Sequence, residues 1–175
     1  NDLENPNSLS SDHINTILVD EQGYLWIGTE NGLNRFDPKT GFFQHFRNDP
    51  RVSNSISGNS ITVLFEDSQG TLWIGTERGG LNRFNPSTST FRAYKQVTRD
   101  DSSLSNNHIT AIAQDEDDDL WIATNHGLNR FDTDSGVFTR YMHGGSNSAT
   151  LSSNIVLALR FDHSGYLWVG TDSGL

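Results

Sequence analysis

Histidines and carboxylates give this 175-residue chain its most obvious capacity for chemistry. The six histidines could act as general bases or metal ligands, but they show neither an H-E-x-x-H motif nor another paired-ligand spacing. The chain has no G-x-S-x-G nucleophile motif, no G-x-x-x-x-G-K phosphate loop and no kinase signature. It has no cysteine, which excludes disulfides, thiol catalysis and zinc–thiolate sites. The sequence therefore predicts no catalytic residue, no metal site and no cofactor.

The strongest concentration of charge is the acidic run from Asp115 to Asp119. Clustered carboxylate oxygens are the ligands that calcium prefers. The run lacks the ligand spacing of an EF-hand loop, so we interpret it as an exposed acidic turn. Asp118 stands where the matching segments elsewhere in the chain have glycine, and this predicts a strained turn.

The net charge of −10 restricts the partners of the chain. Affinity for nucleic acid comes mainly from lysine and arginine side chains that neutralise phosphates, so the sequence predicts no nucleic-acid binding. Anionic membrane surfaces are disfavoured for the same reason. The polar start has no signal-peptide character, and no segment approaches the roughly 20 apolar residues of a membrane span. Any such signal is expected outside this chain.

Four tryptophans divide the chain into repeats. They are separated by 47, 48 and 47 residues, at Trp26, Trp73, Trp121 and Trp168. The surrounding segments also align, as in YLWIGTENGLNRFDP, TLWIGTERGGLNRFNP, DLWIATNHGLNRFDT and YLWVGTDSGL. Regular self-similarity at this period is the signature of a repeat architecture.

Each repeat contains four predicted strands. The first, such as 61–66, is rich in β-branched residues and has apolar side chains on both faces of the strand. The LWIGT run is the second strand and GLNRF is the third, with positive-φ glycines expected at the hairpin between them. A turn such as 37–41 leads into the fourth strand, FFQHF in the first repeat. No segment has a sustained helical period.

The repeats therefore predict an all-β protein, a β-propeller of four-stranded antiparallel blades. We expect about three and a half blades in this chain, and a ring of seven would need roughly 330 residues at this period. The arc is expected to be completed by further blades of a parent chain or by another copy. The expected blades cover about 9–50, 56–97 and 104–143, with a half blade at 151–175.

The combination of LWIGT, GLNRF and a D-x-x-G turn resembles the two-component regulator propeller repeat. This family occurs in the sensor regions of bacterial hybrid histidine kinases and some diguanylate cyclases. The resemblance implies a seven-bladed propeller in the periplasm or elsewhere outside the cytoplasm. It also implies recognition of glycan fragments, and that any kinase or cyclase activity lies outside this chain.

Residues shared by every repeat are expected to serve the blade itself. The tryptophans occupy a central strand, which favours packing between blades over stacking against sugars. The LNRF arginines, Arg35, Arg83 and Arg130, are expected to pair with carboxylates of their own blades.

Residues that differ between repeats are the candidates for binding. They gather at the end of the blades where the fourth-to-first loops and the second-to-third hairpins emerge. Polar groups that converge there would suit a small polar ligand, such as a glycan fragment. The predicted ligand-binding residues are His13, Glu30, Asn31, Glu77, Arg78, His108, Asn125 and His126.

Three functions remain open on the sequence alone. The first is a ligand-sensing segment of a signalling receptor. The second is a scaffold that docks a partner protein, because a fold does not determine function. The third is a hydrolase or lyase with residues converging at the central axis.

Overall fold

The computed structural model describes residues 1–2, 4–5, 7–144 and 150–175, and the strands form four separate antiparallel sheets. Blade 1 contains β1 (Ile14–Val19), β2 (Leu25–Thr29), β3 (Gly32–Asp37) and β4 (Phe42–Phe46). Blade 2 contains β5 (Ile61–Glu66), β6 (Leu72–Thr76), β7 (Leu81–Asn85) and β8 (Thr90–Tyr94). Blade 3 contains β9 (Ile109–Gln114), β10 (Leu120–Thr124), β11 (Gly127–Phe131) and β12 (Phe138–Tyr141). Blade 4 contains β13 (Val156–Phe161) and β14 (Leu167–Thr171).

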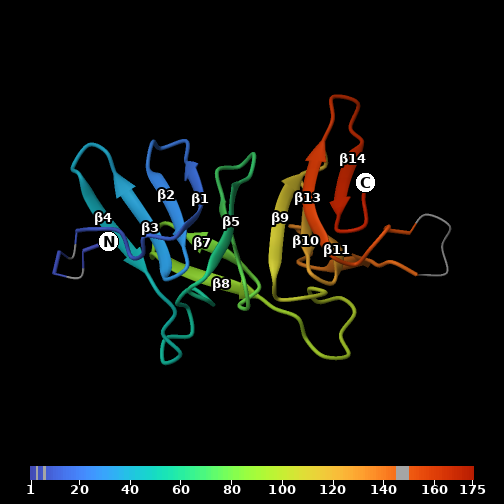
Figure 1. Cartoon of the computed structure of the whole chain (residues 1–175), viewed down its shortest axis with the longest axis horizontal. Helices are drawn as coiled ribbons and strands as arrows, with labels where there is room; N and C mark the ends of the chain where they lie inside the picture. The colour runs from blue at the N-terminus through green and yellow to red at the C-terminus, as the bar shows by residue number, and fades with distance from the viewer. Residues whose placement is uncertain (3, 6, 145–149) are drawn as a thin grey trace.

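The blades stand side by side in an arc (Figure 1). Within each complete blade the strands are hydrogen-bonded in chain order, and the first strands β1, β5, β9 and β13 are neighbours from one blade to the next. This arrangement confirms the propeller predicted from the repeats. No helix long and apolar enough to cross a membrane occurs in the described parts of the chain.

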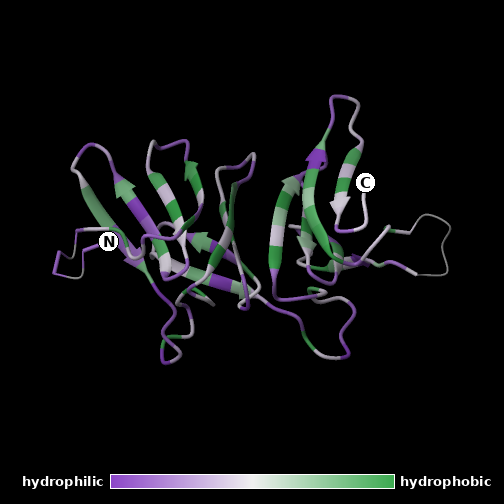
Figure 2. Ribbon diagram, in the orientation of Figure 1, coloured by the Kyte–Doolittle hydropathy of each residue, from purple (hydrophilic) through white to green (hydrophobic). Residues whose placement is uncertain are grey.

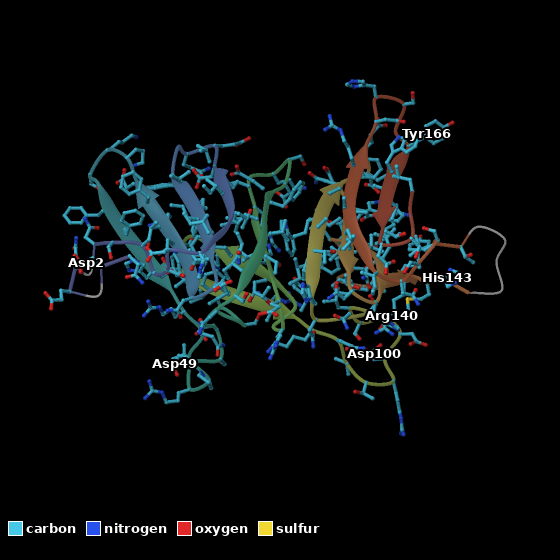
Figure 3. All side chains as sticks on the ribbon, in the orientation of Figure 1. Asp2, Asp49, Asp100, Arg140, His143 and Tyr166 are labelled. Atoms are coloured by element: carbon cyan, nitrogen blue, oxygen red, sulfur yellow. The ribbon has the colours of Figure 1, made fainter. Side chains whose placement is uncertain are left out.

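The two ends of the blades carry different connections. We call the end with the fourth-to-first loops and second-to-third hairpins the loop face, and the opposite end the turn face. Asp49 and Asp100 mark two loops on the loop face, whereas Tyr166 lies on the turn face (Figure 3). The strands that join the two faces hold most of the hydrophobic residues (Figure 2).

The core lies between the blades. Trp26 of blade 1 is 2% exposed and packs against Phe84 of blade 2, with ring centroids 5.1 Å apart. Trp73 makes the equivalent contact with Phe131 of blade 3 at 5.7 Å. The packing role predicted for these two tryptophans is confirmed, and each ring joins its own blade to the next.

Each tryptophan is also held by the aspartate that begins the first turn of its blade. The indole Nε1–H of Trp26 donates to Asp20 Oδ2 at 2.7 Å, and the Tyr24 backbone N–H donates to Asp20 Oδ1 at 2.8 Å. The same pair of bonds recurs at Asp67, Asp115 and Asp162. We call this arrangement the Asp–Trp clamp. It ties the turn to the second strand in all four blades.

A glycine in the second strand sets the spacing between blades. A Cβ added at Gly75 would lie 2.5 Å from Val63 Cγ1 and 2.8 Å from Ile109 Cβ of blade 3. Blade 3 has Ala123 at this position, and its neighbours are correspondingly smaller, with Ala111 in place of Val63 and Val156 in place of Ile109. The larger second-strand residue of blade 3 is therefore compensated by smaller neighbours, and the boundary between the blades stays closely packed.

The LNRF arginines differ from expectation. Arg130 forms ion pairs with blade carboxylates, as predicted, and its closest contact is to Asp119 at 2.6 Å. The guanidinium groups of Arg35 and Arg83 instead lie over aromatic rings, above Tyr24 at 4.6 Å and above Trp73 at 5.8 Å. The prediction of carboxylate pairing is wrong for these two because glutamine, tyrosine, glutamine and threonine replace the acids of blade 3 at Gln22, Tyr24, Gln69 and Thr71.

Candidate functional site

The candidate site is the rim of the loop face, where β1, β5, β9 and β13 begin. In each blade the residue before the first strand lies beside the residue that follows the second strand. The Glu30 N–H donates to the His13 carbonyl at 3.3 Å, and the Asn125 N–H donates to the His108 carbonyl at 3.3 Å. Glu77 with Ser60 and Asp172 with Ile155 repeat this backbone contact. The rim thus has one side-by-side pair per blade.

A second set of backbone bonds fixes each hairpin to the next blade. Gly32 N–H donates to the Asn59 carbonyl at 2.7 Å, and Gly127 N–H donates to the Asn154 carbonyl at 2.7 Å. Gly32 has φ of 126°, a conformation that favours glycine, and an added Cβ would lie 2.9 Å from the Phe46 carbonyl oxygen. Main-chain groups therefore set the position of the rim.

The side chains of the recurrent loop asparagines also serve the backbone. Asn59 Oδ1 accepts the Asn48 N–H at 2.7 Å, and Asn154 Oδ1 accepts the His143 N–H at 2.7 Å. Asn107 makes the same bond to Gln96 at 2.8 Å. These asparagines are supports of the rim, a role that sequence reasoning missed. Their recurrence in three repeats was the available signal.

A buried polar network lies beneath the rim. Asn34 Oδ1 accepts the Ser10 N–H at 2.9 Å, while its Nδ2 donates to Ser10 Oγ at 2.8 Å and to the Ile27 carbonyl at 3.2 Å. Thr29 Oγ1 completes the network through Ser10 Oγ at 2.9 Å. Blades 2 and 3 repeat the serine–asparagine bonds at Ser57 with Asn82 and at Ser105 with Asn129. The rim therefore stands on a satisfied, rigid base.

The predicted binding residues occupy this rim in pairs. His13 and Glu30 are exposed and in contact, with His13 Nδ1 3.1 Å from Glu30 Oε2. Arg78 lies 4.0 Å from Glu77 at the second hairpin. His108 is half-buried beside the exposed Asn125.

The two remaining predicted residues belong to the hairpins. Asn31 Nδ2 donates to the Ser10 carbonyl at 3.4 Å, so part of its hydrogen-bonding capacity serves the loop. His126 is exposed and borders a cavity of about 620 Å³ that Arg140 and Met142 also line.

Arg140 is committed to the loop of blade 3. It donates to the carbonyl oxygens of Asp100, Ser103 and Leu104 and to the Asp101 carboxylate, at 2.7–3.0 Å. Figure 3 shows Arg140 beside the loop that carries Asp100. The chemical variety at the rim therefore lies in the carboxylates, imidazoles and amides of the paired positions.

Within the described parts of the chain, the structure brings the predicted residues together blade by blade. No ion pair or side-chain hydrogen bond joins predicted residues of different blades there. No three histidine or acidic side chains of the described residues are close enough together to hold a metal ion. The rim can offer a row of donors and acceptors to a ligand that spans several blades.

Comparison with known proteins places this geometry in context. The model of the two component regulator propeller family matches residues 8–31, 55–78, 103–126 and 150–173. These four segments make up more than half of the chain. Each one begins on the loop face, at Ser8, Ser55, Ser103 or Thr150, and extends through the first strand and the Asp–Trp clamp to the hairpin.

Two solved structures are similar over almost the whole chain. Both are extracellular domains of hybrid two-component systems from Bacteroides thetaiotaomicron. One is 32% identical, with a TM-score of 0.83 over 94% of this chain and 23% of the other. The second is 29% identical, with a TM-score of 0.77 over 97% of this chain and 22% of the other. This chain therefore spans less than a quarter of either structure.

More distant likenesses concern the fold alone. The surface component PorZ of the type-IX secretion system of Porphyromonas gingivalis is 17% identical, with a TM-score of 0.54. The comparison with curated proteins gives no match.

Proposed function

Because the chain belongs to the two-component regulator propeller family, we propose that it is part of the extracytoplasmic, ligand-sensing propeller of a bacterial signalling receptor. The two extracellular domains described above support the class of protein and its location. The proposal gives this segment no catalytic role. Any enzymatic output would belong to other parts of the receptor.

The observation that carries the proposal is that backbone and side chains have different roles at the rim. Backbone groups fix the rim in the same way in each blade, while the side chains at the paired positions change from blade to blade. Side chains that the fold does not require can vary and take part in ligand recognition. The carboxylates, imidazoles and amides there would suit a small polar ligand such as a glycan fragment.

A partner protein is the second candidate occupant of the loop face. The loops that carry Asp49 and Asp100 extend beyond the rim (Figure 3) and could dock against a protein surface. A ligand screen separates the two candidates, because only the first requires a small molecule.

The open sides of the arc indicate how the ring is completed. Trp168 of blade 4 is 54% exposed, whereas the equivalent Trp26 is covered by the next blade. Ile14 of blade 1 is 44% exposed, whereas the equivalent Ile61 is fully buried. We propose that further blades of the same kind cover both surfaces, and the greater length of the two extracellular domains supports this.

The test is a thermal-shift screen of the complete propeller against a panel of oligosaccharides. A ligand at about 100 times its Kd adds about 2.7 kcal/mol to the free energy of unfolding, a readily measured shift. Glu30→Gln and His108→Ala should abolish the shift of an active oligosaccharide and leave the unliganded melting temperature unchanged. If no oligosaccharide shifts the wild-type propeller, or if both variants retain the full shift, the proposed ligand site is wrong.

A further inference from the structure

A cavity of about 770 Å³ lies between blades 1 and 2 on the turn face, away from the rim. The polar lining comes from Gln22, Tyr24 and Arg35 of blade 1 and from Gln69, Arg83, Asn85 and Arg92 of blade 2. Its volume falls within the roughly 300–1,000 Å³ range of small-molecule pockets. Trp26, Phe84 and Phe91 provide apolar lining.

Three arginines line this cavity, and Arg35 of blade 1 is the half-buried one, whereas Arg83 and Arg92 of blade 2 are exposed. Its guanidinium carbon lies 4.6 Å from the Tyr24 ring centroid and 5.6 Å from that of Trp26. Among the described residues, Arg35 forms no ion pair and its side chain makes no hydrogen bond. The rings cover part of the guanidinium surface, so its edge N–H groups are the donors left for a ligand.

Arg130, the corresponding arginine of blade 3, is paired with carboxylates of its own blade. Arg130 borders a cavity of about 530 Å³ between blades 3 and 4. Its guanidinium lies 2.6 Å from Asp119, 3.7 Å from Asp117 and 3.8 Å from Asp115. Burial alone would lower the pKa of Arg130, but Asp119 and Asp115 raise it above its ordinary value. The protein itself supplies the carboxylates that this arginine requires.

Two substitutions between repeats explain the difference. Asp117 and Asp119 of blade 3 correspond to Gln22 and Tyr24 of blade 1. Asp115 has a counterpart in Asp20, but Asp20 forms no ion pair with Arg35 and already accepts the Trp26 indole and the Tyr24 N–H. Glu66, the other acid of the cavity, accepts the Glu21 N–H at 3.1 Å. Blade 1 therefore keeps the arginine and lacks the acids that neutralise it in blade 3.

We propose that the cavity between blades 1 and 2 is a second binding site, which takes a small molecule bearing a carboxylate. The ligand carboxylate occupies the edge of the Arg35 guanidinium with two parallel hydrogen bonds. Asp119 takes the corresponding place at one terminal nitrogen of Arg130. Gln22, Gln69 and Asn85 bind hydroxyl groups on the body of the ligand. This site lies on the opposite face from the rim, so either site can fail independently of the other.

The test is a titration of the full chain, followed by ligand-observed NMR, with digalacturonate and with galactobiose, a neutral molecule of similar shape. Digalacturonate should bind saturably and galactobiose at least about tenfold more weakly, because a hydrogen bond to a charged group carries that difference. Equal binding of the two sugars, or no binding of digalacturonate, would overturn the proposal. Equally strong binding of inorganic sulfate would show a general anion site and would overturn the carboxylate assignment.

Three variants locate the bound carboxylate. Arg35→Gln removes the donor, and Tyr24→Asp supplies an internal carboxylate copied from blade 3. Both should weaken digalacturonate binding by about ten- to hundredfold. Arg130→Gln, the matched control in blade 3, should leave the affinity unchanged. Wild-type affinity in Arg35→Gln, or an equal loss in the control, would contradict the site.

Arg35→Lys keeps the positive charge and is the variant to use if Tyr24→Asp lowers the melting temperature. Lysine is a point charge that cannot offer two parallel N–H groups. Its affinity should therefore lie between those of the wild type and Arg35→Gln. A lysine variant that binds as tightly as the wild type would contradict recognition by a planar guanidinium.

Discussion

The turn face and the loop face of this arc are held in place by different kinds of contact. On the turn face, side chains hold the structure together, because an aspartate clamps a tryptophan in every blade. On the loop face, backbone groups hold the hairpins to the next blade and to the first strands. The clamping aspartate and tryptophan are the same in every blade, whereas the paired side chains of the rim differ. Residues that recur in every repeat therefore identify the scaffold, and residues that differ between repeats identify the surface available for binding.

The largest test of this comparison removes a turn-face ring. Trp73→Ala should lower the free energy of unfolding by about 3–5 kcal/mol, as large core truncations do. The loss includes the contact with Phe131 of blade 3 and leaves the Asp67 carboxylate without its indole donor. Urea denaturation of the chain measures the effect. An unchanged midpoint would show that the tryptophans are not the links between blades.

The second test removes the other half of the clamp. Asp67→Ala deletes the acceptor for the Trp73 indole at 2.8 Å and for the Thr71 N–H at 2.8 Å. We expect a loss of about 2–3 kcal/mol, because these bonds are made to a charged, buried group. A double-mutant cycle with Trp73→Phe isolates the indole bond. Strictly additive losses would mean that aspartate and tryptophan do not act as a unit.

The third test applies the same kind of change to the loop face. Glu30→Gln and His13→Ala alter the exposed histidine–glutamate contact of the rim, whose nearest atoms are 3.1 Å apart. Exposed pairs contribute little, so the unfolding free energy should change by less than about 0.5 kcal/mol. Thermal denaturation provides the measurement. A loss as large as that of Asp67→Ala would remove the distinction between the two faces.

The smallest test concerns an acid of the turn face, Glu66. Burial raises its pKa above the ordinary value of 4.5, and Asp20, Glu21 and Asp67 raise it further, while the hydrogen bond from the Glu21 N–H lowers it. Folding therefore favours the protonated carboxyl of Glu66. The stabilisation that results is fully present below pH 4.5 and is lost as the pH rises through the folded-state pKa.

Glu66→Gln should remove this pH dependence and raise the unfolding free energy at pH 7 by up to about 0.5 kcal/mol. Blade 3 already has glutamine at this place, where Gln114 Oε1 accepts the Ser68 N–H at 2.8 Å. Denaturation curves between pH 4 and pH 7 compare the variant with the wild type. A variant that is less stable at pH 7 and equally stable at pH 4 would reverse the assigned sign.

Much of the fold follows from the sequence because each blade is specified by local patterns. Tryptophan spacing, strand alternation and turn residues act within one repeat, and four repeats report the same pattern independently. The left-handed conformation of Asp118, with φ of 65°, was predictable from the glycines at the equivalent positions. The Asp–Trp clamp was less accessible, because aspartate is common in turns and only the geometry shows that its second oxygen meets the indole.

The candidate sites were predictable only in part, because contacts between blades depend on direction as well as spacing. Sequence reasoning placed His13 and Glu30 at the same end of the blades, but it did not identify Asn59, whose side chain supports the backbone there. It also assigned the three LNRF arginines one role. Their different environments depend on neighbours such as Tyr24 and Asp119, which become visible when the repeats are compared position by position.

The exchange of bulk around Gly75 and Ala123 has a consequence for how such arcs can be recombined. Gly75 accommodates Ile109 of the following blade, whereas Ala123 requires the shorter Val156 and the small Ala111. A blade grafted at the borders of its own sheet would keep the fitted pair of its first and second strands but lose the matching residue in the first strand of the next sheet. The heritable module is therefore longer than the visible blade. It extends from the first strand of one sheet into the first strand of the next, and successful shuffling or duplication should preserve that whole stretch.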